Sequence, residues 1–196
     1  LWWCYLKNQV GFHFDAAENW IRYDYHVFEA PYTPAIFMSC TEVVSGFECS
    51  RDAFCGKGGS LERPLGLTAG TWSNSQLPGG GHGAGVLGVE LELAAGATRR
   101  LGYVLGVAPD WTQAAALRQH FSQVAAFDEA HAALQEFWSD RATVLQASTR
   151  DAHADRMINT WNPLNCEVAL NIARGISTDH MGVDGLRFRD TMQDAL

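Results

Sequence analysis

The order of secondary-structure patterns along the chain restricts its fold more than any other feature. Residues 1–108 carry strand-type segments one after another, and a helical pattern begins only at Asp110. Aromatic and β-branched residues dominate segments 1–8, 19–28 and 34–44. Strands that follow one another without crossover helices favour an antiparallel sandwich over a parallel sheet. We therefore expect a mostly antiparallel β-sandwich followed by helices.

Two details of the strand region predict which side chains share a face of a strand and which two strands pair. In segment 20–27, Trp, Arg, Asp and His alternate with Ile, Tyr, Tyr and Val, as in a strand with two different faces. Segments 86–93 and 99–107 are also strand-like, and they are joined by Ala-Ala-Gly-Ala-Thr, whose glycine suits a turn. We expect these two segments to form a β-hairpin.

Three helices are expected after the strands. Asp110 and Gln113 fit a capping box, with Trp111 at the first helical position. A second helix is expected over 128–146, with an apolar stripe that favours core packing over a cofactor site; its members are Leu134, Phe137, Trp138, Ala142 and Leu145.

The third helical segment begins near Ala152 and contains a proline. Pro163 removes a backbone donor, so we expect a kink, or a restart of the helix with Asn162 as its cap. Its buried side is expected to comprise Met157, Ile158, Trp161, Leu164, Val168 and Ile172.

Composition excludes several classes of function. The net charge of −8 comes without a basic cluster, which argues against a nucleic-acid partner. No apolar run reaches transmembrane length, so no membrane partner is expected. The five cysteines form no CxxC pair, and no histidine lies near Cys49 and Cys55 in sequence. We expect reduced thiols, no metal site and a cytoplasmic location.

Two glycine-rich stretches interrupt the strand region. Residues 54–64 lack the Gly-Lys-Ser/Thr ending of a phosphate loop, and residues 77–85 are typical of a connection before a strand. His82 in the second stretch is interpreted as a solvated loop side chain rather than a ligand contact.

The last stretch, residues 185–196, places charged and apolar side chains in close alternation. The guanidinium of Arg189 beside the carboxylate of Asp190 suits a pocket for a polyhydroxylated ligand, since one group donates hydrogen bonds and the other accepts them. A salt-bridged surface helix is the alternative, and charge pattern alone favours it. The chain has no leading methionine and stops within a helical pattern, so we interpret it as an internal fragment.

The run Gly-Leu-Arg-Phe-Arg-Asp-Thr-Met-Gln-Asp, residues 185–194, resembles a motif of the inverting disaccharide phosphorylases of glycoside hydrolase family 94. Upstream, Trp161 and Asn162 match a Trp-Asn-x-Tyr-Gln segment of that family, although Leu164 and Asn165 replace its Tyr and Gln. Further matches are an Arg-x-x-Ser, a strand-region Arg-x-x-Phe-x-Gly before a proline, and a closing hairpin; the residues of the first two are Arg174, Ser177, Arg51, Phe54, Gly56 and Pro64.

This resemblance implies an organisation and a binding site. It implies the C-terminal part of a β-sandwich domain (1–108), a helical linker (109–151) and the first helices of an (α/α)6 catalytic barrel (152–196). Arg189 and Asp190 would bind the sugar of the −1 subsite. A further arginine of the family is missing here, where Val183 and Asp184 stand; Arg187 is the nearest substitute.

The resemblance also implies a reaction. A β-linked gluco-disaccharide or oligosaccharide would be cleaved by inorganic phosphate with inversion, giving an α-sugar 1-phosphate without a cofactor. The general acid would lie beyond Leu196, so no catalytic residue is assigned and the fragment alone is expected to be inactive. The alternatives are the phosphorylase-like part of a cyclic β-glucan synthase and a non-catalytic carbohydrate-binding sandwich. A homodimer is left open.

Overall fold

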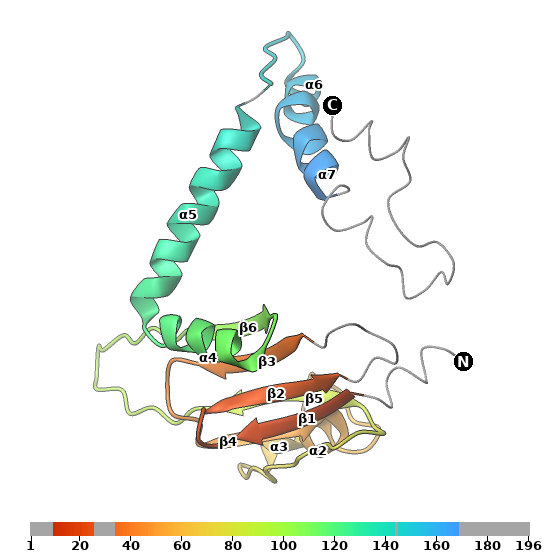
Figure 1. Cartoon of the computed structure of the whole chain (residues 1–196), viewed down its shortest axis with the longest axis vertical. Coiled ribbons are helices and arrows are strands. Elements are labelled where there is room, and N and C mark those ends of the chain that lie inside the picture. The colour runs from red at the N-terminus through yellow and green to blue at the C-terminus, as the bar shows by residue number, and fades with distance from the viewer. Residues whose placement is uncertain (1–9, 26–33, 144, 169–196) are drawn as a thin grey trace. The chain divides into compact units, whose positions relative to one another are not determined.

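The computed structural model describes residues 10–25, 34–143 and 145–168 (Figure 1). The chain divides into two units, Leu1–Asp128 and Glu129–Leu196. The predicted strand over residues 1–8 lies outside the described residues.

A four-stranded antiparallel sheet forms the centre of the first unit. Its order is β1-β2-β3-β6, and the strands are β1 (Val10–Asp15), β2 (Trp20–Tyr25), β3 (Ala35–Cys40) and β6 (Tyr103–Ala108). A second antiparallel sheet pairs β4 (Gly46–Ser50) with β5 (Gly83–Gly88). Sequential antiparallel strands in two sheets confirm the expected sandwich.

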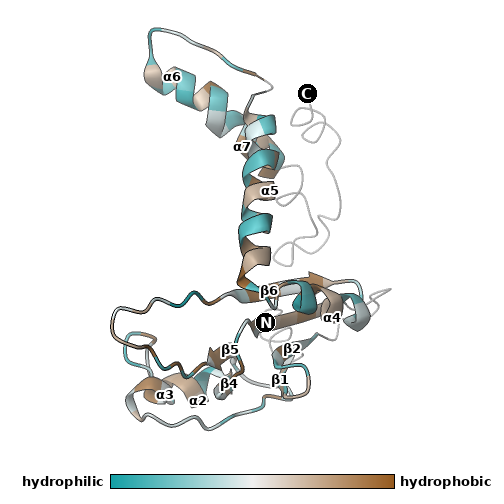
Figure 2. Ribbon diagram, turned by 90° about the vertical axis from the view of Figure 1, so that its left-hand side faces the viewer, coloured by the Kyte–Doolittle hydropathy of each residue, from teal (hydrophilic) through white to brown (hydrophobic). Residues whose placement is uncertain are grey.

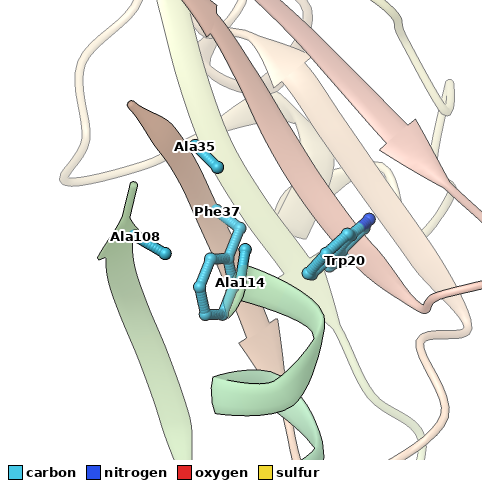
Figure 3. Close-up of a cluster of buried hydrophobic side chains, with 5 residues drawn as sticks. All are labelled: Trp20, Ala35, Phe37, Ala108 and Ala114. Carbon is cyan, nitrogen blue, oxygen red and sulfur yellow. The ribbon is translucent and has the colours of Figure 1, made fainter. Parts of the chain in front are cut away.

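The alternation in β2 fills a separate core on each face of the four-stranded sheet. Ile21 faces the second sheet and is buried with Cys49 of β4 and Leu87 of β5. Trp20 points the other way and packs with Phe37 and the helical Ala114 (Figure 3). The predicted two-faced strand is therefore confirmed for β2.

Helix α4 (Trp111–His120) covers the outer face of the four-stranded sheet, and its start agrees with the prediction. Asp110 has an extended backbone, and its carboxylate accepts a hydrogen bond from the Gln113 N–H at 2.8 Å. The Gln113 side chain returns to the Asp110 carboxylate at 2.9 Å rather than to a backbone N–H, a variant of the capping box. Arg22 lies over the Trp111 ring at 3.8 Å and ties β2 to this helix.

The predicted hairpin of residues 86–93 and 99–107 is wrong. Strand β5 ends at Gly88 and pairs with β4, whereas β6 begins at Tyr103 and pairs with β3. The two segments therefore belong to different sheets, and residues 89–102 connect them without strand pairing. The alternation of 89–93 resembles a strand, but Glu90, Glu92 and Leu93 are exposed and face no partner strand among the described residues.

Helix α5 (Val124–Ala142) begins four residues before the predicted second helix. Polar and apolar turns alternate along its ribbon (Figure 2). Leu134 and Phe137 of the predicted core stripe are 53% and 39% exposed, so in the described structure that stripe is not a buried core. Trp138 and Ala142 are half-buried.

The helical segment of the second unit runs through Pro163 without the predicted cap. Helix α6 (Ala152–Arg156) passes into a π-helical turn, η1 (Met157–Trp161), and then into α7 (Asn162–Val168). Asn162 is itself helical, and its N–H reaches back five residues to the carbonyl of Met157. The helix therefore does not restart at Asn162, and the expected capping by Asn162 is wrong. The wider π turn lies just before Pro163, the residue that lacks a backbone N–H donor.

The π-helical turn also redistributes the predicted buried side. Ile158 and Leu164 are half-buried, but Met157, Trp161 and Val168 are exposed. Ile172 lies outside the described residues. A strict 3.6-residue period does not hold across a π turn. For this reason the side chains predicted for one buried face of the helix do not all lie on the same face.

Candidate functional site

The residues predicted to bind sugar, Arg189 and Asp190, lie outside the described residues. The same is true of Arg174, Ser177 and the segment 183–187. Their roles therefore stay predictions from the sequence. The described residues that matched the motifs are Arg51, Phe54, Gly56 and Pro64 in the first unit, and Trp161 and Asn162 in the second.

Arg51 stands where β4 turns directly into the short helix α2 (Arg51–Cys55). Its backbone N–H donates to the carbonyl of His82 at 2.9 Å, which joins this turn to the start of β5. Its guanidinium Nη2 donates to the carbonyl of Gly59 at 3.2 Å. The loop to Gly59 passes through Gly56 and Gly58, whose φ angles of 84° and 73° favour glycine. Arg51 thus holds two loops together.

Glu48 in the middle of β4 is the most buried charged residue among those described, with 1% exposure. Its carboxylate accepts hydrogen bonds from the backbone and hydroxyl of Ser73, at 2.6 and 2.8 Å. It accepts two more from the backbone and hydroxyl of Ser75, at 3.1 and 2.5 Å. We call these three residues the Glu48 clamp.

Burial raises the pKa of Glu48, but the hydrogen bonds from Ser75 and Ser73 outweigh burial, so its pKa lies below the ordinary value. A carboxylate held as the anion by four donors has no proton to give. Glu48 is therefore a structural group and not a general acid. Its sequence signal was Glu between apolar neighbours in a strand, together with a Ser-x-Ser spacing, and sequence reasoning missed it.

Trp72 packs flat across the cross-strand pair Gly46 and Gly88. A Cβ atom on either glycine would lie 2.1 or 2.3 Å from the indole, so only glycine leaves room for this ring. Phe54, one of the motif residues, is nearly parallel to Trp72, with ring centroids 6.4 Å apart. The motif phenylalanine is thus one of the groups that position the loop before Ser73.

A cavity of about 310 Å³ opens beside Arg51. Among described residues it is lined by Val10, Phe12, Arg51, Gly81, His82 and Gly83. His82 is exposed and also lines this cavity, so its interpretation as a solvated loop side chain stays a prediction.

A second, mostly apolar cavity of about 280 Å³ lies within the helical unit, lined by Trp138, Arg141, Ala142, Thr160, Pro163 and Leu164. Arg141 stacks on Phe137 at 3.4 Å and pairs with Glu167 of α7, also at 3.4 Å. The motif residue Trp161 is 48% exposed, and Asn162 is exposed as well.

The described residues contain no group of three or more His, Cys, Asp or Glu side chains arranged to hold a metal ion. Cys40, Cys49, Cys55 and Cys166 are free thiols. None of the helices found in the described part of the chain is long and apolar enough to cross a membrane.

Two family models match the chain in the order that the fold suggests. The glycosyl hydrolase 94 supersandwich domain matches residues 7–124, more than half of the 196 residues. The catalytic domain of the glycosyl hydrolase 94 superfamily matches residues 137–196. The sandwich lies within the first match and helices α6 and α7 within the second.

Two curated proteins are similar over most of the chain. An N,N'-diacetylchitobiose phosphorylase from Vibrio proteolyticus is 29% identical over 177 residues, which is 90% of this chain and 22% of that protein. The cyclic beta-(1,2)-glucan synthase NdvB from Rhizobium meliloti (strain 1021) is 28% identical over 156 residues, 78% of this chain and 5% of that protein. The chain thus spans less than a quarter of either relative. With a sandwich and a following helical segment that both match, the chain belongs to the glycosyl hydrolase 94 family.

Proposed function

We propose that the protein containing this chain is a glycoside phosphorylase that cleaves a β-linked gluco-disaccharide with inorganic phosphate. The observation that carries the proposal is the catalytic-domain match over residues 137–196, which includes the Arg189–Asp190 pair. The similarity to a chitobiose phosphorylase over 90% of the chain supports it. The product is an α-sugar 1-phosphate, formed with inversion.

The proposed chemistry is that of an inverting glycosidase with phosphate in place of water. A carboxylic acid protonates the glycosidic oxygen, and phosphate attacks the anomeric carbon from the opposite face. Because phosphate is already a nucleophile near neutral pH, one acid is enough and no cofactor is required. We expect that acid beyond Leu196, because the family resemblance implies that it lies further along the catalytic domain than the segment matched here.

Arg189 and Asp190 are proposed to bind the sugar whose anomeric carbon reacts. The carboxylate accepts hydrogen bonds from hydroxyl groups, and the guanidinium donates them in a fixed fork. Val183 and Asp184 stand where the resemblance implies another arginine, so the identity of this sugar is not assigned.

The test is the phosphate dependence of disaccharide cleavage by the full-length protein. We expect sugar 1-phosphate to form only with inorganic phosphate; cleavage at the same rate without phosphate would identify a hydrolase instead. Replacing Arg189 by Ala should raise KM for the disaccharide by about tenfold or more. Arg99→Ala, which removes a surface ion pair with Glu42 in the sandwich, is the matched control. Unchanged kinetics of the Arg189 variant would refute its assignment.

A second candidate is the phosphorylase-like part of a cyclic β-glucan synthase, which the similarity to NdvB over 78% of the chain favours. The reading frame around this chain distinguishes the two, because the synthase-type protein is about four times longer, as the shares of the two relatives show. A cytoplasmic location and a homodimer stay predictions.

A further inference from the structure

The cavity beside Arg51 has the composition of a binding site rather than of a packing defect. Its volume of about 310 Å³ is at the lower end of the range for small-molecule sites. Val10 and Phe12 supply an apolar wall, while Arg51 and His82 supply polar groups from two other segments. Such a mixture of an apolar wall and a few convergent polar groups is typical of ligand pockets.

The wall of the cavity is held in place by its neighbours. The Phe12 ring packs edge-on against Tyr23, at 4.8 Å between centroids, and lies so close to Gly83 that a Cβ there would be 1.9 Å away. The backbone of Phe12 exchanges two hydrogen bonds with Leu77, at 2.6 and 2.9 Å. The aromatic wall is therefore fixed before any ligand arrives, which lowers the entropic cost of binding.

Arg51 brings a half-buried positive charge to the cavity. Of its guanidinium donors, one is used by the Gly59 carbonyl, and no carboxylate of the described residues forms an ion pair with it. Among the other described arginines, Arg99, Arg100, Arg118 and Arg141 have carboxylate partners, and Arg22, Arg63, Arg150 and Arg156 form no ion pair with a described carboxylate. What sets Arg51 apart from these last four is that it lines this cavity. A guanidinium left without an acid partner in a chain of net charge −8 suits an anionic ligand.

We propose that this cavity binds a phosphorylated sugar, with the apolar face of the ring against Val10 and Phe12 and the phosphate on Arg51 and His82. Guanidinium groups bind phosphate oxygens in a bidentate manner, and an imidazole is a second donor. Aromatic and aliphatic side chains suit the C–H face of a sugar ring. The choice of a sugar phosphate over another anion rests on the proposed function, because such a molecule is the product of that reaction.

The test is a calorimetric titration of the full-length protein with α-D-glucose 1-phosphate. To separate this cavity from the proposed reaction site, the titration is made on the Asp190→Asn variant and on the same variant with Arg51→Gln added. We expect one remaining site in the single variant, weakened by about tenfold or more in the double variant. Asp190→Asn with Arg99→Gln is the matched control and should bind as the single variant does.

Two further titrations make the result decisive. His82→Ala in the Asp190→Asn background changes an exposed side chain, so it leaves the fold intact and should weaken the same site by several-fold. Inorganic phosphate alone and glucose alone should each bind at least about tenfold more weakly than the sugar phosphate. Isotherms that are identical with and without Arg51, or no binding left in the Asp190→Asn variant, would overturn the proposal. Equal affinity for inorganic phosphate alone would overturn its sugar part. Phosphorolysis by the wild-type protein tests the proposed function separately.

Discussion

At the scale of single residues, the Glu48 clamp shows how a buried charge is kept in the sandwich. Four donors from two serines satisfy one carboxylate, and in doing so they fix the loop that precedes Leu77. A buried carboxylate without partners would be strongly destabilising. Glu48 therefore needs the loop in its place as a source of donors, and the loop needs the Glu48 carboxylate as its acceptor.

Replacing Glu48 by Gln should lower the free energy of unfolding by about 1–3 kcal/mol, because an amide offers one acceptor oxygen and places an NH2 group among donors. Chemical denaturation of the purified protein measures the change. Glu62→Gln, at an exposed site, is the matched control and should have little effect. Equal stability of the two variants would mean that the clamp contributes nothing.

The same clamp predicts a dependence of stability on pH. The pKa of Glu48 in the folded protein lies below its ordinary value of 4.5, so the folded state releases this proton more readily than the unfolded chain does. The stabilisation is fully present above about pH 4.5 and is lost as the pH falls through the folded pKa. The stability difference between wild type and Glu48→Gln should therefore shrink as denaturation is repeated from about pH 7 to about pH 3. A constant difference would contradict this.

At the scale of elements, local signals predicted helix starts better than they predicted strand partners. The Asp110 cap is a contact between residues three apart, so the sequence displays it directly. The pairing of β6 with β3 joins residues more than 60 positions apart, and no local pattern reports it. The alternation of residues 86–93 therefore indicated a strand but not its sheet, and the nearest strand-type neighbour was the wrong partner.

Removal of the Asp110 cap should loosen helix α4 and with it the outer core around Trp20. We expect Asp110→Ala to lower the melting temperature by a few degrees, since the first turn loses its side-chain acceptor, whereas Asp110→Asn keeps an acceptor and should retain most of the stability. Thermal melts followed by circular dichroism measure both variants. Equal melting of the alanine and asparagine variants would show that the hydrogen bond is not stabilising.

At the scale of the whole molecule, the composition and the order of patterns predicted the sandwich and its following helices. The Glu48 clamp and the Arg51 cavity were not predictable, because each joins segments that are distant in sequence. The cavity is lined by residues of β1, of the start of α2 and of the segment that leads into β5. The clamp joins Glu48 of β4 to the loop of Ser73 and Ser75. The predicted sugar-binding pair, by contrast, came from a contiguous motif, and its test is the kinetics of the full-length protein.

Cys49 offers a measure of how cooperatively the sandwich opens. It is fully buried between the two sheets, and this burial raises the pKa of its thiol to about 12. We expect alkylation of native protein to modify the half-buried Cys166 of the helical unit well before Cys49. Mass spectrometry of the digested protein at successive times gives the two rates. Labelling of Cys49 as fast as Cys166 would mean that the sheets separate readily under native conditions.

The π-helical turn of residues 157–161 acts as an angular spacer within one continuous helix. A π turn holds more residues than an α turn, so side chains after it project in directions shifted from those of an unbroken α-helix. Deleting one residue there should convert the π turn into an α turn and leave the facing of α7 nearly unchanged relative to α6, because the wider turn already absorbs one extra residue. Arg141 should then keep Glu167, its partner on α7. The π turn thus accommodates one extra residue while the following helix presents the same side chains.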